Sequence, residues 1–193
     1  DAVHGADLAI DLQGVPINEL SNVHANGYLD MHFIPPMLLA GADLWPGTGR
    51  ADAGNYAVAG SASLSLGLSD PGGQIWLGAG TDRSGEATLA WRPKNAPAGT
   101  FLIADTTLGK GVGEARSWRQ VRGGAGYEGR IGSVRARVWG LAYDGVFASP
   151  GVLRLDDLEA GRKKFYDAYP GSGGGHSQRF LAGAERHKEQ ENA

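Results

Sequence analysis

The sequence contains five histidines, the side chains best suited to bind a transition metal: His4, His24, His32, His176 and His187. A zinc-binding helix places two histidines four residues apart, and no two of these have that spacing. Cysteine is absent, so thiolate ligands are absent too. We therefore expect the histidines to lie in loops and strands rather than in a purpose-built metal site.

Motifs for nucleophilic and phosphate chemistry are missing or incomplete. No G-x-S-x-G sequence is present to expose a catalytic serine. The glycine clusters at 47–54 and 109–113 are not followed by a helix with Lys-Ser or Lys-Thr, so they indicate turns rather than phosphate loops. Asp156, Asp157 and Glu159 lack the spacing of a calcium loop and fit the solvated start of a helix. The sequence therefore predicts neither an enzyme nor a bound cofactor.

The overall composition favours a β protein and excludes some partners. Glycine accounts for 32 residues, and charged residues make up only 20% of the chain. Gly-rich, alternating sequence is more typical of β than of helical architecture. The formal net charge of −3 gives no electrostatic reason to expect binding to nucleic acid. The longest apolar segment, 33–42, is interrupted by two prolines, so we expect no membrane-spanning helix.

From residue 74 onward, apolar and polar residues alternate with a period of two, as in strands with two different faces. Six such segments are present: 74–79, 86–92, 100–108, 118–128, 133–143 and 178–187. Short turns at 94–99 and 129–132 alternate with longer loops at 109–117 and 144–176. We expect six consecutive antiparallel strands.

The fifth segment leaves two architectures open. By alternation, Val134 and Val138 face away from Arg135 and Arg137. The arginine face would be the solvent face of a soluble β-sandwich or the polar lumen of an outer-membrane barrel. Strands near ten residues, with short turns at one end and long loops at the other, favour the barrel. Two aromatic residues stand beside the short turns, where such barrels carry an aromatic girdle: Trp91 and Tyr127.

The first 70 residues show a different pattern of residue types. Residues 7–12 alternate as a half-buried strand, and Gln13-Gly14 turns the chain into a second strand that Pro16 places at a sheet edge. Two prolines at 35 and 36 begin a short helix at Met37. The stretch 44–68 combines turn glycines with a small-residue strand. We interpret it as a hinge between a compact domain and the strands that follow.

Three segments, in this order along the chain, resemble TonB-dependent outer-membrane receptors. Residues 9–18 are similar to a strand-turn motif of that family's plug domain, with Gln13 where Asp is usual. Residues 46–61, with Pro46-Gly47 and a small-residue strand, are similar to the end of the plug. Residues 149–157 are similar to an external loop of some members. The resemblance covers nearly the whole chain.

The resemblance implies a mostly β fold: a mixed α/β plug remnant over residues 1–69, and the first six strands of an incomplete transmembrane β-barrel over residues 70–193. It implies a fragment of a barrel of roughly 22 strands in the outer membrane of a Gram-negative bacterium. The implied function is energy-coupled uptake of a small-molecule or other cargo. Outer-membrane lipid is an implied partner, and so is TonB, through a segment absent from this chain.

The resemblance also implies where cargo binds, because the apex of the plug meets external loops in this family. The matching polar loop is 21–28, and its expected ligand-binding residues are Asn22, His24, Asn26 and Tyr28, with His4 adjacent. The long loop 144–176 would form the outer wall of the site, with Arg154, Tyr166 and Tyr169. The alternative is that 21–28 is an ordinary polar loop.

Two other classes of function remain open. A soluble or cell-surface β-sandwich binding module would use the same period-two strands. An enzyme built on an outer-membrane barrel is disfavoured, because no constellation of acid, base and nucleophile is visible in the sequence.

Overall fold

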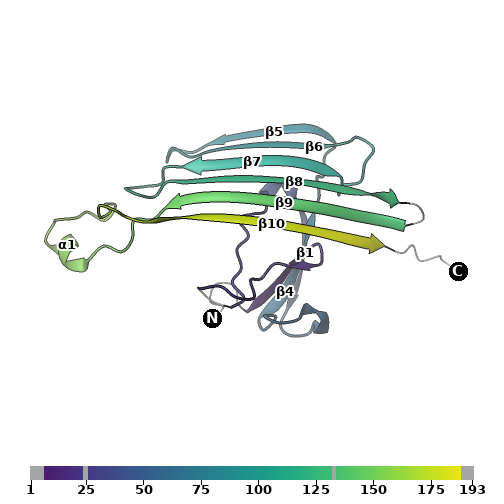
Figure 1. Ribbon diagram of the computed structural model, residues 1–193, viewed down its shortest axis with the longest axis horizontal. Coiled ribbons are helices and arrows are strands. Elements are labelled where there is room, and N and C mark those ends of the chain that lie inside the picture. Colours follow the sequence, from purple (N-terminus) through teal and green to yellow (C-terminus); the bar gives the residue numbers. More distant parts are fainter. Residues whose placement is uncertain (1–6, 24–25, 132–133, 188–193) are drawn as a thin grey trace.

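The computed structural model of the chain describes residues 7–23, 26–131 and 134–187. The fold is mostly β, and its strands form one four-stranded and one six-stranded sheet, here called the small sheet and the large sheet. Figure 1 shows the large sheet extending across the molecule with the small sheet beneath its middle. Residues 7–68, which carry the small sheet, are called the small subdomain.

The small sheet is mixed, with the strand order β2-β1-β4-β3. Its strands are β1 (Leu8–Leu12), β2 (Val15–Pro16), β3 (Leu39–Pro46) and β4 (Gly60–Leu66). The central strands β1 and β4 are parallel, and each edge strand is antiparallel to its neighbour. Two 3-10 turns accompany them: η1 (Pro36–Leu38) and η2 (Ala51–Ala53).

Several predictions for this region are confirmed. The β1–β2 hairpin turns at Gln13 and Gly14, whose φ values of 51° and 74° are those of a type I′ turn. Pro16 lies in the edge strand β2. The helix predicted at Met37 is the single turn η1, which Pro36 begins.

The hinge expected at 44–68 is wrong. That stretch contains the end of β3 and the whole of β4, and β4 pairs on both sides within the small sheet. Strand β3 itself was not expected, because all eight of its residues are exposed and its sequence has no buried-face alternation to reveal it. The small sheet therefore depends on the stretch that the sequence suggested was a connector.

The large sheet has the order β10-β9-β8-β7-β6-β5, and each strand is antiparallel to its sequence neighbour. Its strands are β5 (Gly72–Ala79), β6 (Gly85–Arg92), β7 (Phe101–Gly109), β8 (Trp118–Ile131), β9 (Val134–Ala148) and β10 (Gly174–His187). The six predicted strands are confirmed, although β8 and β9 are longer than predicted. Among the described strands, β5 and β10 are edges, so the sheet is open rather than closed.

The connections of the large sheet differ at its two ends. Loops 80–84, 110–117 and 149–173 share one end, called here the loop end, and the last of them contains the one-turn helix α1 (Leu155–Glu159). The connection 93–100 lies at the other end, called the turn end, where β8 also ends and β9 begins. The long loop predicted at 144–176 is present as 149–173, but the predicted alternation of short and long connections is not met throughout, because 80–84 at the loop end is shorter than 93–100 at the turn end.

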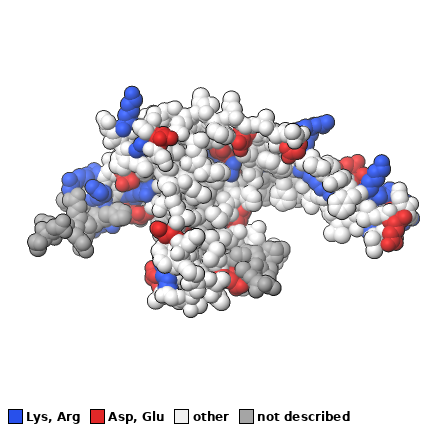
Figure 2. All heavy atoms as spheres, turned by 180° about the vertical axis from the view of Figure 1, so that it is seen from behind, with Lys and Arg blue, Asp and Glu red and all other residues white. Residues whose placement is uncertain are grey.

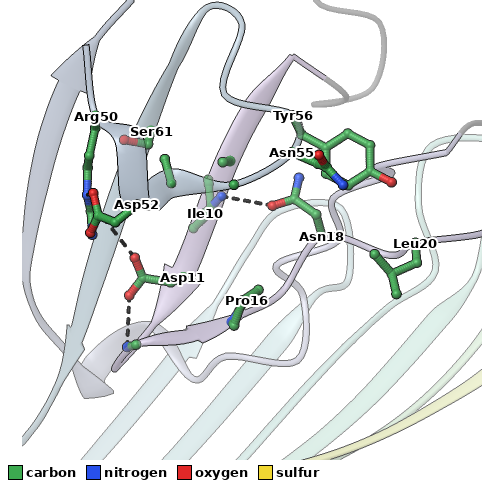
Figure 3. Close-up of a pocket in the computed structure, with 14 residues that line it drawn as sticks. Ile10, Asp11, Pro16, Asn18, Leu20, Arg50, Asp52, Asn55, Tyr56 and Ser61 are labelled. Carbon is green, nitrogen blue, oxygen red and sulfur yellow. Dashed lines mark hydrogen bonds and ion pairs between the residues drawn. The ribbon is translucent and has the colours of Figure 1, made fainter. Parts of the chain in front are cut away.

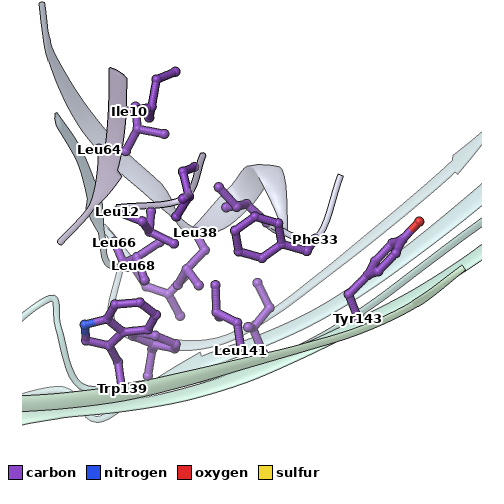
Figure 4. Packing of buried hydrophobic residues seen from close by; sticks show 14 of the residues in the cluster. Ile10, Leu12, Phe33, Leu38, Leu64, Leu66, Leu68, Trp139, Leu141 and Tyr143 are labelled. Atoms are coloured by element: carbon purple, nitrogen blue, oxygen red, sulfur yellow. The ribbon is translucent and has the colours of Figure 1, made fainter. Parts of the chain in front are cut away.

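One apolar core joins the two sheets. Leu12, Leu38 and Leu66 from the small subdomain pack in one cluster with Trp139 and Leu141 from β9 (Figure 4). Burial of such side chains contributes about 25 cal/mol for each Å² removed from water. The core therefore holds one face of the large sheet against the small subdomain.

Candidate functional site

The face of the large sheet that points away from the small subdomain is apolar and exposed. Pairing puts Leu89, Ala104 and Gly123 in one row across the strands, with Ala142 and Phe180 continuing it. The large apolar side chains exposed on this outer face are Ile75, Leu77, Leu89, Trp91, Leu102, Leu108, Val121, Tyr127, Val138, Val146 and Phe180. A contiguous patch of this extent marks an interaction surface rather than ordinary solvent exposure.

Polar residues bound this apolar band on β8, β9 and β10. Towards the loop end, Asp144 accepts hydrogen bonds from Gln178 and His176 at 2.8 and 2.7 Å. Towards the turn end, the outer face of β10 has no charged residue until Arg186, which follows Gln178 by eight residues. Figure 2, seen from behind, shows Lys and Arg mostly towards the two ends of the large sheet. The band thus has two polar margins.

The inner face of the large sheet carries a buried polar network. Asp105 on β7 accepts from the Arg122 Nε at 2.5 Å and from the Thr88 hydroxyl at 2.7 Å. All three side chains are buried, and they come from three adjacent strands. A buried ion pair of this kind is stable only when its remaining polar atoms are also paired.

Arginines of the inner face donate to main-chain carbonyls of the small subdomain. Arg179 donates to the Ile17 and Asp30 oxygens at 2.8 and 3.2 Å, and its guanidinium lies 4.3 Å from the ring centre of Phe33. Arg122 donates to the His32 oxygen at 3.4 Å. Arg137 donates to the oxygen of Leu66. The prediction that Arg137 faces away from Val138 is confirmed.

The described residues of the loop predicted to sense cargo, 21–23 and 26–28, are hydrogen-bonded to the segment that follows β2. The side-chain amide of Asn22 donates to the Glu19 carboxylate at 2.5 Å. The main-chain N–H of Glu19 donates to the main-chain oxygen of Tyr28 at 2.9 Å. Asn26 is exposed. The two predicted histidines, His4 and His24, lie outside the described residues. The described part of the loop therefore has a defined conformation, with Asn26 free to meet solvent.

The predicted outer wall forms a separate cluster. Arg154 pairs with Asp156 at 2.6 Å, and the Tyr169 hydroxyl donates to Asp157. The Arg116 guanidinium lies 5.8 Å from the ring centre of Tyr166. Figure 1 places the loop that contains α1 beyond the loop end of the large sheet, whereas the small subdomain lies beneath its middle. The structure does not bring the two predicted halves of the site together.

The small subdomain contains a cavity of about 440 Å³ that was not predicted from the sequence. Figure 3 shows it between β1, the segment after β2, and the loop 50–56. Its lining includes Asp11, Asn18, Arg50, Asp52, Asn55, Tyr56 and Ser61. Gly27 lies next to the cavity, because the side-chain amide of Asn18, a lining residue, donates to the Gly27 oxygen at 3.1 Å. The parallel pairing of β1 with β4, in which Ala9 is opposite Ser61 and Asp11 opposite Ser63, brings these lining residues together.

Arg50 dominates the electrostatics of the cavity. It forms a bidentate pair with Asp52, at 2.9 and 3.0 Å, and lies 3.9 Å from Asp11. Its guanidinium also lies 4.2 Å from the ring centre of Trp45. The hydrogen bond from Arg50 lowers the pKa of Asp52, and the same bond raises the pKa of Arg50. The pair is solvent-accessible, so its contribution to stability is small.

We expect Arg50→Met to raise the pKa of Asp52 towards its ordinary value. The folded-state pKa of Asp52 is depressed, so its stabilising contribution is present above the unfolded-state pKa and is lost as the pH falls through the folded-state pKa. The variant loses that acid-dependent contribution. Carbon-detected NMR titration of the carboxylates measures the change. Asp82 is the internal control, because its pKa is lowered by Ser84 instead and must not move.

Comparisons with known proteins add no relative. No family model and no curated protein matches this chain. In the part of the chain that the structure describes, no helix is long and apolar enough to cross a membrane. The described residues also contain no cluster of three His, Asp or Glu side chains placed to hold a metal ion. The site must therefore be interpreted from its own geometry.

Proposed function

We propose that this chain is part of a TonB-dependent outer-membrane receptor, in which residues 1–69 belong to the plug and residues 70–193 contribute six strands to the barrel. The receptor would bind a cargo outside the cell and admit it when TonB acts on the plug, without covalent chemistry. The observation that carries the proposal is the exposed apolar band on the outer face of the large sheet. The sequence resemblance described above supports it.

The dimensions of the band suit a membrane. Gln178 and Arg186 lie eight residues apart on β10, and a strand rises about 3.3 Å per residue, so they are about 26 Å apart along the strand. A tilt of about 40° reduces this to about 20 Å, close to the roughly 25 Å apolar band of outer-membrane barrels. Trp91 and Tyr127 are exposed on this face near its turn end, as in an aromatic girdle.

The inner face suits the lumen of a plugged barrel. Beside its apolar core residues it carries the buried Asp105 and Arg122, and its arginines hold the small subdomain through main-chain oxygens. The edges support the proposal too, because β5 and β10 expose unpaired main-chain groups, which further strands of a complete barrel would pair.

The alternative, a soluble or cell-surface β-sandwich, explains the inner face of the large sheet but not its apolar outer face. The two sheets share an apolar core, as the layers of a sandwich do. A soluble sandwich places polar side chains on the outer face of each sheet, whereas the large sheet exposes leucine, valine, tryptophan and phenylalanine there. We therefore favour the barrel.

Fluorescence quenching by lipid tests the proposal. The full chain is folded into vesicles whose acyl chains carry bromine, which quenches indole fluorescence on contact. A variant that retains Trp91 but has Trp139→Phe is compared with one that retains Trp139 but has Trp91→Phe. We expect quenching to be several-fold stronger when Trp91 is present, because Trp91 is exposed on the outer face and Trp139 is buried against the small subdomain.

The other three tryptophans contribute equally to both variants, so the difference reports on these two positions. Protease protection and circular dichroism establish that both variants have folded in the vesicles. Equal quenching in the two folded variants, or a chain that folds in buffer and ignores the vesicles, would overturn the membrane assignment in favour of the sandwich.

A further inference from the structure

The cavity of the small subdomain contains a buried hydroxyl with no partner. Ser61 lies on β4, is 4% exposed, and lines the cavity. Its Oγ makes no hydrogen bond within the described residues. Burial of an unpaired hydroxyl is unfavourable, so such a group in a native structure requires an explanation.

The neighbouring serine on the same face of β4 shows the contrast. Ser63 pairs with Asp11 across the sheet, and its hydroxyl donates to the Asp11 Oδ1 at 2.7 Å. The Gly14 amide donates to the same oxygen at 2.8 Å. Among the described residues, Asp11 Oδ2 has Arg50 alone as a neighbouring charge, at 3.9 Å, which is beyond hydrogen-bond distance. The cavity therefore offers an acceptor at Asp11 as well as the hydroxyl of Ser61.

The charges of the cavity argue against a charged ligand. One guanidinium, Arg50, lies between two carboxylates, Asp52 and Asp11. An anion would meet the two carboxylates, and a cation would have to lie beside Arg50. The anion would lose hydration without a free counter-charge, since Asp52 already holds Arg50 in a bidentate pair, and the cation would gain Asp11 only at the cost of repulsion from Arg50. A neutral ligand has neither cost.

The remaining groups both donate and accept. Ser61 and Tyr56 carry hydroxyls, and Asn55 carries an amide that is exposed at the rim. Pro16 and Leu20 add apolar surface on the opposite side (Figure 3). Alternating donors and acceptors beside a small apolar surface match a ring that carries hydroxyl groups and C–H bonds. The volume of about 440 Å³ is within the range of small-molecule sites.

We propose that this cavity binds a neutral polyhydroxylated ligand of monosaccharide or disaccharide size, with Ser61 Oγ and Asp11 Oδ2 as its deepest polar contacts and Asn55 and Tyr56 at its rim. The site lies wholly within the small subdomain, on the face of the small sheet opposite the core. It is independent of whether the large sheet contacts lipid.

NMR with maltose and glucose as probes tests this site. The side-chain indole signal of Trp45 is the reporter, because the Arg50 guanidinium lies 4.2 Å from its ring centre and links it to the cavity. Trp45→Phe identifies the signal. We expect a saturable shift of the Trp45 signal at millimolar sugar, together with saturation transfer from the protein to the sugar protons.

Ser61→Ala distinguishes a binding group from an unsatisfied hydroxyl. It removes a side-chain oxygen that has no protein partner, so the fold is retained, and we expect sugar affinity to fall tenfold or more. Ser65→Ala, on the same strand but outside the cavity lining, must bind as the wild type does. Asn55→Ala is a second test variant, changed in an exposed loop, and we expect it to bind the sugar more weakly than the wild type does.

Two results would overturn the proposal. One is the absence of any saturable shift with either sugar in the folded wild-type chain. The other is a Ser61→Ala variant that binds as tightly as the wild type, which would make the hydroxyl a structural feature only. Lipid quenching of Trp91 is unaffected by either result, so this site and the membrane assignment can fail separately.

Discussion

Asp105→Ala is expected to destabilise the chain by about 3–5 kcal/mol, because it leaves the buried guanidinium of Arg122 without its counter-charge. Arg122 is 7% exposed, and both of its bonds to Asp105 are 2.5 Å long. Within the described part of the chain its one other hydrogen bond, to the His32 oxygen, is 3.4 Å and too weak to replace the carboxylate. Urea unfolding, followed by the fluorescence of the buried Trp139, measures the loss.

Two control variants separate the effect of removing the charge of Asp105 from the effect of removing its volume. Thr88→Val removes the hydroxyl that donates to Asp105 and keeps the shape, so about 1 kcal/mol is expected. The double variant Asp105→Leu with Arg122→Met removes both charges, and it should recover most of the stability lost in Asp105→Ala. A loss below 1 kcal/mol in Asp105→Ala would mean that water reaches Arg122 and that the inner face is not sealed by the small subdomain.

Ala182→Arg is expected to cost about 2–4 kcal/mol of folding free energy in lipid vesicles, because it places a charge at the middle of the outer apolar band. Ala182 lies on β10 midway between the polar margins at Gln178 and Arg186. An arginine there would have no ion-pair partner directly opposite on β9, since residue 182 faces Gly140. Equilibrium unfolding in vesicles of short-chain phosphatidylcholine gives the value.

Gln178→Arg is the matched control for that change. It introduces the same charge on the same strand and face, but at the margin of the band, where the cost in a membrane is about 0–1 kcal/mol. A soluble sandwich makes a different prediction, because both arginines would then be solvated and would cost equally little. Equal stability of the two variants in vesicles would therefore contradict the proposed barrel.

The strands of the large sheet were predictable because their information is local. A period of two in residues 74–79 or 86–92 fixes which side chains share a face, whatever lies against that face. The Gln13-Gly14 turn was predictable for the same reason, since it needs two adjacent residues with positive φ. By contrast, β3 has no local signal, because both of its faces are exposed and it is held by its pairing with β4.

The site was harder to predict than the strands. The polar loop 21–28 and the long loop with Arg154 and Tyr169 each have the composition of a binding loop, but composition does not say whether two loops meet. The structure holds them apart, and it instead forms a cavity from Asp11, Arg50 and Ser61. Those three residues are separated by tens of positions in the chain, and parallel pairing of β1 with β4 brings Asp11 and Ser61 onto one face.

The strands of the large sheet, the alternation of their two faces and the turn that closes the first hairpin could be inferred from the chain alone, since they depend on neighbouring residues. The choice of the buried face could not, because Arg137 and Arg179 look like solvent-facing charges until main-chain oxygens of the small subdomain are placed within reach. The exposure of Leu102 and Phe180 likewise follows from the three-dimensional packing. Burial depends on what packs against a face, and alternation along one strand contains no information about that neighbour.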